Sequence, residues 1–163
     1  MTSPSLEQQI DNKFSLSLLL AFLFTIPYIA VGQTARPETP EEKLAQSAGV
    51  YLGAIEYVRV LKQSSCGYAF RRTFPPIDEV LRKEILPAFS PTAQKEVEAS
   101  FGSMKPALAR QAQKFVGEII AAEKKELDPK TACGVAAGML GGIGSQAFGQ
   151  WKSAKSQYGW KGR

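Results

Sequence analysis

Three times in this chain, a residue that can cap a helix stands directly before a proline. The pairs are Thr39-Pro40, Ser90-Pro91 and Asp128-Pro129. A side-chain oxygen before the first turn accepts hydrogen bonds from unpaired backbone N–H groups, and proline suits the first helical position because it lacks an N–H. Each pair therefore predicts a helix start. After the first pair, Glu42 stands where it would complete a capping box.

Apolar residues follow the first of these starts at helical spacing, which predicts a helix over 40–63 with one buried face. The face consists of Leu44, Ala48, Tyr51, Ile55 and Val58. No stretch of the chain shows sustained period-two alternation, and no Asn-Gly or Asp-Gly hairpin signal occurs. We therefore expect an all-α fold: a compact bundle of four to five helices tied by one disulfide.

A short second amphipathic helix is expected after Pro75-Pro76, because proline blocks a helix before it and permits one after it. Pro87 should interrupt this helix, and Phe89 should pack down at its end.

Glycine and proline also interrupt the region 91–127. Gly102 and Pro106 make one unbroken helix unfavourable there, so we expect either a kinked helix or two helices that meet. The last helix should end near Gly149, which gives a helical domain over 39–149. The basic, aromatic residues 150–163 are expected to fray as a C-terminal tail.

An apolar stretch without charge, residues 14–29, stands near the N-terminus. Lys13 precedes it, and the small residues Ala30-Val31-Gly32 follow it. This pattern predicts a secretion signal over 1–32 that is cleaved near Gly32, then a flexible leader over 33–38. We therefore expect a periplasmic or secreted protein; the alternative is an uncleaved membrane anchor.

Cys66 and Cys133 are the two cysteines of the chain. An even count in an exported protein predicts a disulfide, and closing so long a loop should stabilise the fold by about 4 kcal/mol. The alternative is a redox-active pair, which usually needs a Cys-x-x-Cys spacing that is absent here.

Histidine is absent from the whole chain. This excludes Ser-His-Asp and Cys-His catalysis and the usual zinc and haem ligand sets, so we expect no catalytic residue, no metal and no cofactor. Carboxylates are the remaining acid–base groups. Glu56 lies beside Arg59 at helical spacing and is expected on a solvated face.

Gly134, Gly138 and Gly142 form a double Gly-x-x-x-Gly series in the last helix. Glycine costs roughly 1 kcal/mol against alanine in a helix, so the series needs a reason. Close packing against another helix is the first interpretation. Helix contact within a membrane is the second. A phosphate-binding loop is a third, although the GxxxxGK[ST] motif is missing.

Two segments are weak candidates for binding. No acid follows Asp128, so basic character is concentrated at the C-terminal end beside aromatic residues. A second cluster of arginine and aromatic residues follows Cys66, where it could anchor an interface or pack into the core. The candidates are Tyr68, Arg71, Arg72, Trp151, Lys152, Lys155, Tyr158 and Trp160.

These observations predict an exported, non-enzymatic helical protein that binds another envelope or secreted protein. Toxin neutralisation and an accessory role in the envelope or in secretion are examples. One alternative is peripheral binding to an anionic membrane surface through the tail. Another is an enzyme that depends on carboxylates. The net charge of +5 names no partner, and nucleic acid is not expected outside the cytoplasm. No motif assigns the chain to a family.

Overall fold

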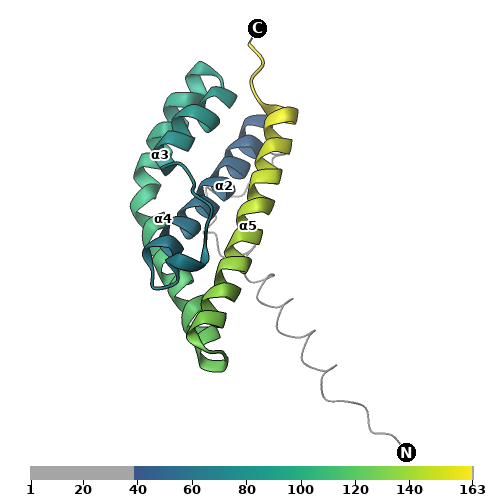
Figure 1. The fold of residues 1–163 in the computed structure, drawn as a ribbon. Coiled ribbons are helices and arrows are strands. Elements are labelled where there is room, and N and C mark those ends of the chain that lie inside the picture. Colours follow the sequence, from purple (N-terminus) through teal and green to yellow (C-terminus); the bar gives the residue numbers. More distant parts are fainter. Residues whose placement is uncertain (1–38, 163) are drawn as a thin grey trace, which may run out of the picture. The chain divides into compact units, whose positions relative to one another are not determined.

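The computed structural model describes residues 39–162, and Figure 1 shows that they are mostly helical. Four helices pack against one another, and none of the described residues lies in a strand, so the all-α class is confirmed for this part. The predicted signal (1–32) and leader (33–38) lie outside the described residues. The elements are α2 (Pro40–Gln63), η2 (Gly67–Ala69), α3 (Ile77–Val80), the π-helical η3 (Leu81–Ile85), the 3₁₀-helical η4 (Leu86–Ala88), α4 (Pro91–Glu126) and α5 (Pro129–Tyr158).

All three predicted helix starts are capped as expected. The hydroxyl oxygen of Thr39 accepts from the N–H of Glu42 at 3.2 Å, and the Glu42 carboxylate accepts from the N–H of Thr39 at 2.6 Å. The Ser90 hydroxyl accepts from the N–H of Ala93. Asp128 accepts from two backbone N–H groups in the first turn of α5. These caps fix where α2, α4 and α5 begin.

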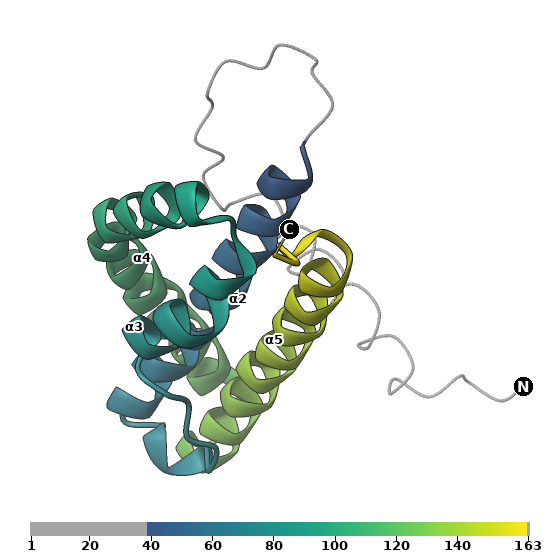
Figure 2. The same ribbon diagram turned by 90° about the horizontal axis from the view of Figure 1, so that it is seen from above.

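Helix α2 lies between α4 and α5 and packs against both (Figure 2). Its five predicted face residues are all buried, and its bounds are those expected. Residues outside that face are buried as well, because helices cover α2 on more than one side. They include Leu52, Ala54, Val60 and Leu61.

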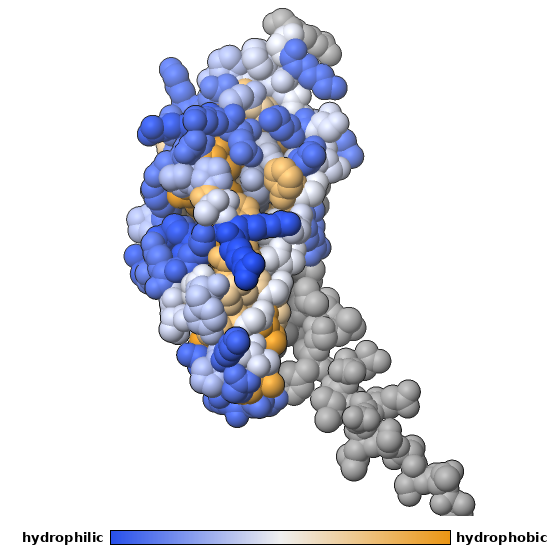
Figure 3. Space-filling model, in the orientation of Figure 1, coloured by the Kyte–Doolittle hydropathy of each residue, from blue (hydrophilic) through white to orange (hydrophobic). Residues whose placement is uncertain are grey.

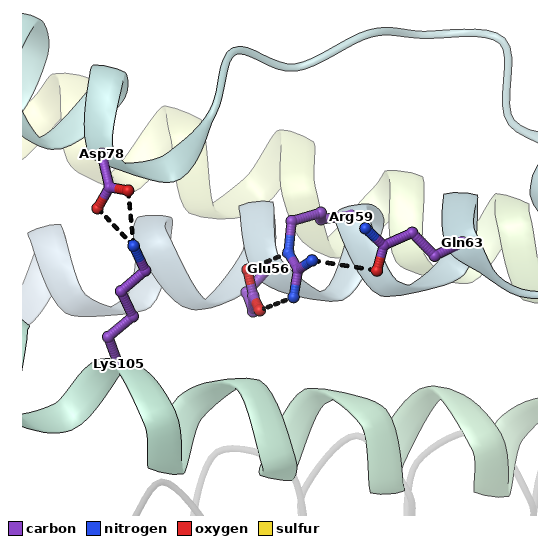
Figure 4. Close-up of polar contacts among 5 residues, drawn as sticks. All are labelled: Glu56, Arg59, Gln63, Asp78 and Lys105. Atoms are coloured by element: carbon purple, nitrogen blue, oxygen red, sulfur yellow. Dashed lines mark hydrogen bonds and ion pairs between the residues drawn. The ribbon is translucent and has the colours of Figure 1, made fainter.

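The double burial of α2 makes the expectation for Glu56 wrong. Its residue surface is only 4% exposed. The carboxylate accepts two hydrogen bonds from the guanidinium of Arg59, at 2.7 and 2.5 Å, and Arg59 also donates to the side chain of Gln63 (Figure 4). A buried carboxylate needs such a partner because its removal from water costs several kcal/mol.

The region between Pro76 and Ser90 contains the expected short helical segment, divided into α3, η3 and η4. Pro87 has no N–H to donate, so one helical hydrogen bond is lost where the segment changes to the 3₁₀-helical η4. Phe89, at its end, is 1% exposed and belongs to the core. An ion pair of 2.6 Å between Lys105 of α4 and Asp78 of α3 links the two helices (Figure 4).

Helix α4 is one continuous helix with Pro106 inside it. Of the two alternatives for this region, the kinked helix is the one that fits, since α4 changes direction along its length in Figure 2. The proline ring crowds the carbonyl four residues earlier, which belongs to Gly102. Because of the bend, both halves of α4 can pack against the rest of the fold.

Helix α5 continues to Tyr158, so the expectation that the helix ends near Gly149 is wrong, and so is the expected fraying over residues 150–158. Trp151 is 2% exposed and Ala154 is 7% exposed. They continue the buried face of α5 at helical spacing. The C-terminal part of α5 therefore packs into the same core as α2 and η3.

The glycine series does not pack against another helix. A Cβ added at Gly134, Gly138 or Gly142 would meet no atom within 4 Å, and all three residues are exposed. The expected close packing at these positions is therefore wrong. The buried side of α5 is instead formed by small residues around Cys133, chiefly alanines.

Cys66 and Cys133 form the predicted disulfide, with Cα atoms 4.9 Å apart. It joins the chain just after α2 to the first turns of α5 and is consistent with an oxidising compartment. Gly67 follows the bridge, where a Cβ would stand 2.2 Å from the carbonyl oxygen of Lys62. Within residues 39–162, no helix is both long enough and apolar enough to cross a membrane.

Candidate binding groove

Two open hollows adjoin along α5. The first, of about 540 Å³, is bordered by Tyr51, Arg71, Arg72, Phe74, Ser145 and Phe148. The second, of about 700 Å³, is bordered by Glu84, Phe148, Lys152, Lys155, Trp160 and Lys161. Phe148 lines both, so we treat the hollows as one site, the α5 groove. Figure 3 shows apolar surface exposed on this face, with strongly hydrophilic side chains reaching across it.

The first hollow depends on the segment 70–76, which joins η2 to α3 and carries Arg71 and Arg72. Phe70 rests on α5 at Gly141, where an added Cβ would be 3.3 Å from its Cε2 atom. The rings of Phe70 and Phe74 stack with centroids 6.2 Å apart. These contacts hold the segment against α5, so the two arginines border the groove.

The second hollow depends on the residues after α5. The N–H of Trp160 donates to the carbonyl of Ala88 at 2.7 Å. This bond folds the chain end back onto η4 and places Trp160 and Lys161 at the rim of the groove. The indole side chain of Trp160 remains at the surface, since the residue is 49% exposed.

Phe148 stands at the junction of the two hollows and is 41% exposed. Its ring centroid lies 5.4 Å from that of Tyr51. The ammonium nitrogen of Lys152 lies 5.5 Å from the same centroid, in cation–π contact. The middle of the groove is therefore apolar, with a positive charge beside it.

The charge of the groove is strongly unbalanced. Its lining includes five basic side chains, Arg71, Arg72, Lys152, Lys155 and Lys161, and one acidic side chain, Glu84. The carboxylate of Glu84 accepts from the hydroxyl of Tyr51 at 3.4 Å. Burial, and next the charge and hydrogen bond of Glu84, raise the pKa of Tyr51 to about 12. The phenol therefore stays protonated at neutral pH.

The structure brings together six of the eight binding candidates at this groove. Arg71 and Arg72 line the first hollow, and Trp151, Lys152, Lys155 and Trp160 belong to the second, although Trp151 is buried and leaves only an edge there. Tyr68 and Tyr158 line neither hollow. Tyr68 is exposed in η2, and Tyr158 packs against the core beneath Lys43.

Sequence reasoning missed Phe148 and Tyr51 as groove residues. One feature of the sequence could have identified Phe148 as a groove residue. It lies four residues before Lys152 and therefore shares a helix face with this binding candidate. Tyr51 was assigned to the core, and its contact with Phe148 depends on how α2 and α5 pack.

The described residues contain no group of three His, Cys, Asp or Glu side chains that could hold a metal ion. Comparisons with protein-family models, with curated proteins and with solved structures find no match to this chain.

Proposed function

We propose that this chain is an exported, non-enzymatic helical protein that binds another envelope or secreted protein through the α5 groove. The single observation that carries the proposal is the convergence at Phe148 of two basic, aromatic segments that are far apart in the sequence. Rigid aromatic side chains beside arginine are typical of the energetic centre of protein interfaces. Toxin neutralisation or an accessory role in secretion would both use such a surface.

Two further observations support this role. The disulfide is consistent with an oxidising compartment such as the periplasm or the exterior, where the predicted signal would send the chain. Among the described residues, only one acid, Glu84, lines the groove, whereas acid–base catalysis by carboxylates alone usually needs two that lie close together.

Site-specific photo-crosslinking in the native envelope tests the proposal. A photoreactive residue would replace Ser145 or Ser156, which line the two hollows, or Gln113, an exposed residue of α4 that lines neither. We expect the same partner to be captured from Ser145 and Ser156 and not from Gln113. Capture from Gln113 alone, or equal capture from all three sites, would contradict the proposal.

A further inference from the structure

We propose that the occupant of the α5 groove is an extended acidic segment of the partner protein, with one apolar side chain seated on Phe148 and carboxylates on either side of it. This inference rests on the proposed function, because it assumes that the groove binds a protein. It adds the chemistry of the segment that is recognised.

The distribution of charge predicts the carboxylates. Basic side chains lie on both sides of Phe148: Arg71 and Arg72 line the first hollow, and Lys152, Lys155 and Lys161 line the second. Among residues 39–162, no hydrogen bond or ion pair joins the side chain of any of these five to another residue. Arginine binds carboxylates through two parallel hydrogen bonds, and lysine attracts them as a point charge.

The middle of the groove predicts the apolar side chain. Phe148 is 41% exposed, lines both hollows and leans on Tyr51. A carboxylate placed there would lose water without gaining a hydrogen-bond donor from the ring. An apolar side chain would instead cover the ring and gain free energy in proportion to the area removed from water.

The shape of the site favours a chain segment over an anionic membrane surface. Trp151, one of the aromatic residues that a membrane-binding tail would insert, is only 2% exposed. Trp160 is tied to Ala88 by its backbone, so the residues after α5 are held against the fold. A concave site with charge on both sides suits a narrow, extended ligand better than a flat bilayer.

Fluorescence anisotropy with synthetic peptides tests the inference on the exported, oxidised protein. The probe is a labelled peptide with two glutamates on each side of one leucine. One control peptide has glutamines in place of the glutamates, and another has alanine in place of leucine. We expect only the first to bind tightly, with an affinity that falls as salt is added, because exposed charges are screened.

Matched variants locate the binding site. Arg71→Gln with Arg72→Gln, and Lys152→Gln with Lys155→Gln, each remove two charges from one side of Phe148. Lys95→Gln with Lys125→Gln removes two exposed charges of α4 that line neither hollow. Each groove pair should raise the Kd about tenfold, since hydrogen bonds to charged groups are among the strongest in proteins. The Lys95→Gln, Lys125→Gln variant should change the Kd less than about twofold. Phe148→Ala should raise the Kd of the acidic peptide.

The outcomes separate this inference from the proposed function. If photoreactive residues at Ser145 and Ser156 capture a partner but no acidic peptide binds, the groove binds a protein and the inference that the bound segment is acidic is wrong. If the glutamine peptide binds equally well, or the α4 pair loses as much affinity as the groove pairs, the inference is overturned. It is also overturned if only phosphatidylglycerol vesicles bind and the groove pairs abolish that binding. Absence of both peptide binding and crosslinking contradicts both proposals.

Discussion

Phe70 rests on Gly141: a Cβ at Gly141 would lie 3.3 Å from the Cε2 atom of the ring. This contact places the segment with Arg71 and Arg72 against α5. It also identifies which of the many glycines of α5 meets another element, since Gly134, Gly138 and Gly142 have no such neighbour.

Gly141 and Gly138 should therefore respond oppositely to larger side chains. Gly138→Ala should stabilise the protein by about 0.5–1 kcal/mol, because alanine loses less backbone entropy in an exposed helix. Gly141→Leu should destabilise it by about 1–3 kcal/mol, because Phe70 would have to move. Urea unfolding with the disulfide intact measures both. Equal effects at the two positions would show that the Phe70 contact does not matter to stability.

The disulfide should carry a large share of stability, since it closes a loop between Cys66 and Cys133 with a sequence separation of 67. Reduction should lower the free energy of unfolding by about 4 kcal/mol in the chain-entropy model. Thermal melting with and without reductant measures the loss, with a variant carrying Cys66→Ser and Cys133→Ser as the control that reductant should not affect. Melting of the parent that is unchanged by reductant would contradict the prediction.

Local signals made the helix starts predictable. The caps at Thr39, Ser90 and Asp128 act on the residues just after them, so the sequence alone contains the whole interaction. The extent of α5 was predictable in principle from the stripe through Cys133 and Trp151. The disulfide requires Cys133 to lie on the face of α5 that points toward Cys66. Trp151 lies on the same face five helical turns later, so burial of both residues predicts a helix that extends at least to Trp151. The glycines and basic residues of this segment obscured the pattern.

Tertiary arrangement explains what could not be predicted. Glu56 is buried because α2 is covered by two helices, whereas its periodicity indicated a single face. The α5 groove forms where the segment after η2, the π-helical η3 and the end of α5 meet. The sequence contains both basic segments but gives no indication that Phe148 joins them.

The buried pair in α2 should matter more than a surface pair of similar spacing. Arg59→Ala would leave the Glu56 carboxylate, whose side chain is 5% exposed, without its donor, and should cost about 1–3 kcal/mol. Lys83→Ala removes an exposed pair with Glu79 and should cost less than about 0.5 kcal/mol. Urea unfolding of both variants at neutral pH gives the comparison. Similar losses would mean that the burial of Glu56 has no energetic consequence.

Tyr51 should make stability depend on pH in the alkaline range. Its pKa is raised from 10.0 to about 12, first by burial and then by Glu84. Between these values the folded protein keeps a proton that the unfolded chain has lost, so the free energy of unfolding should fall as pH rises from about 10 to about 12. Tyr51 contributes no such dependence below pH 10, where both states hold the proton.

Tyr51→Phe isolates this contribution because it removes the titrating hydroxyl and keeps the ring against Phe148. Urea unfolding at several pH values between about 9 and about 12 should show a shallower decline in the variant than in the parent. Glu84→Gln should give an intermediate slope, since burial is the larger cause of the pKa shift and remains in that variant. Identical slopes for the parent and Tyr51→Phe would mean that the hydroxyl titrates in the folded state as it does in the unfolded chain.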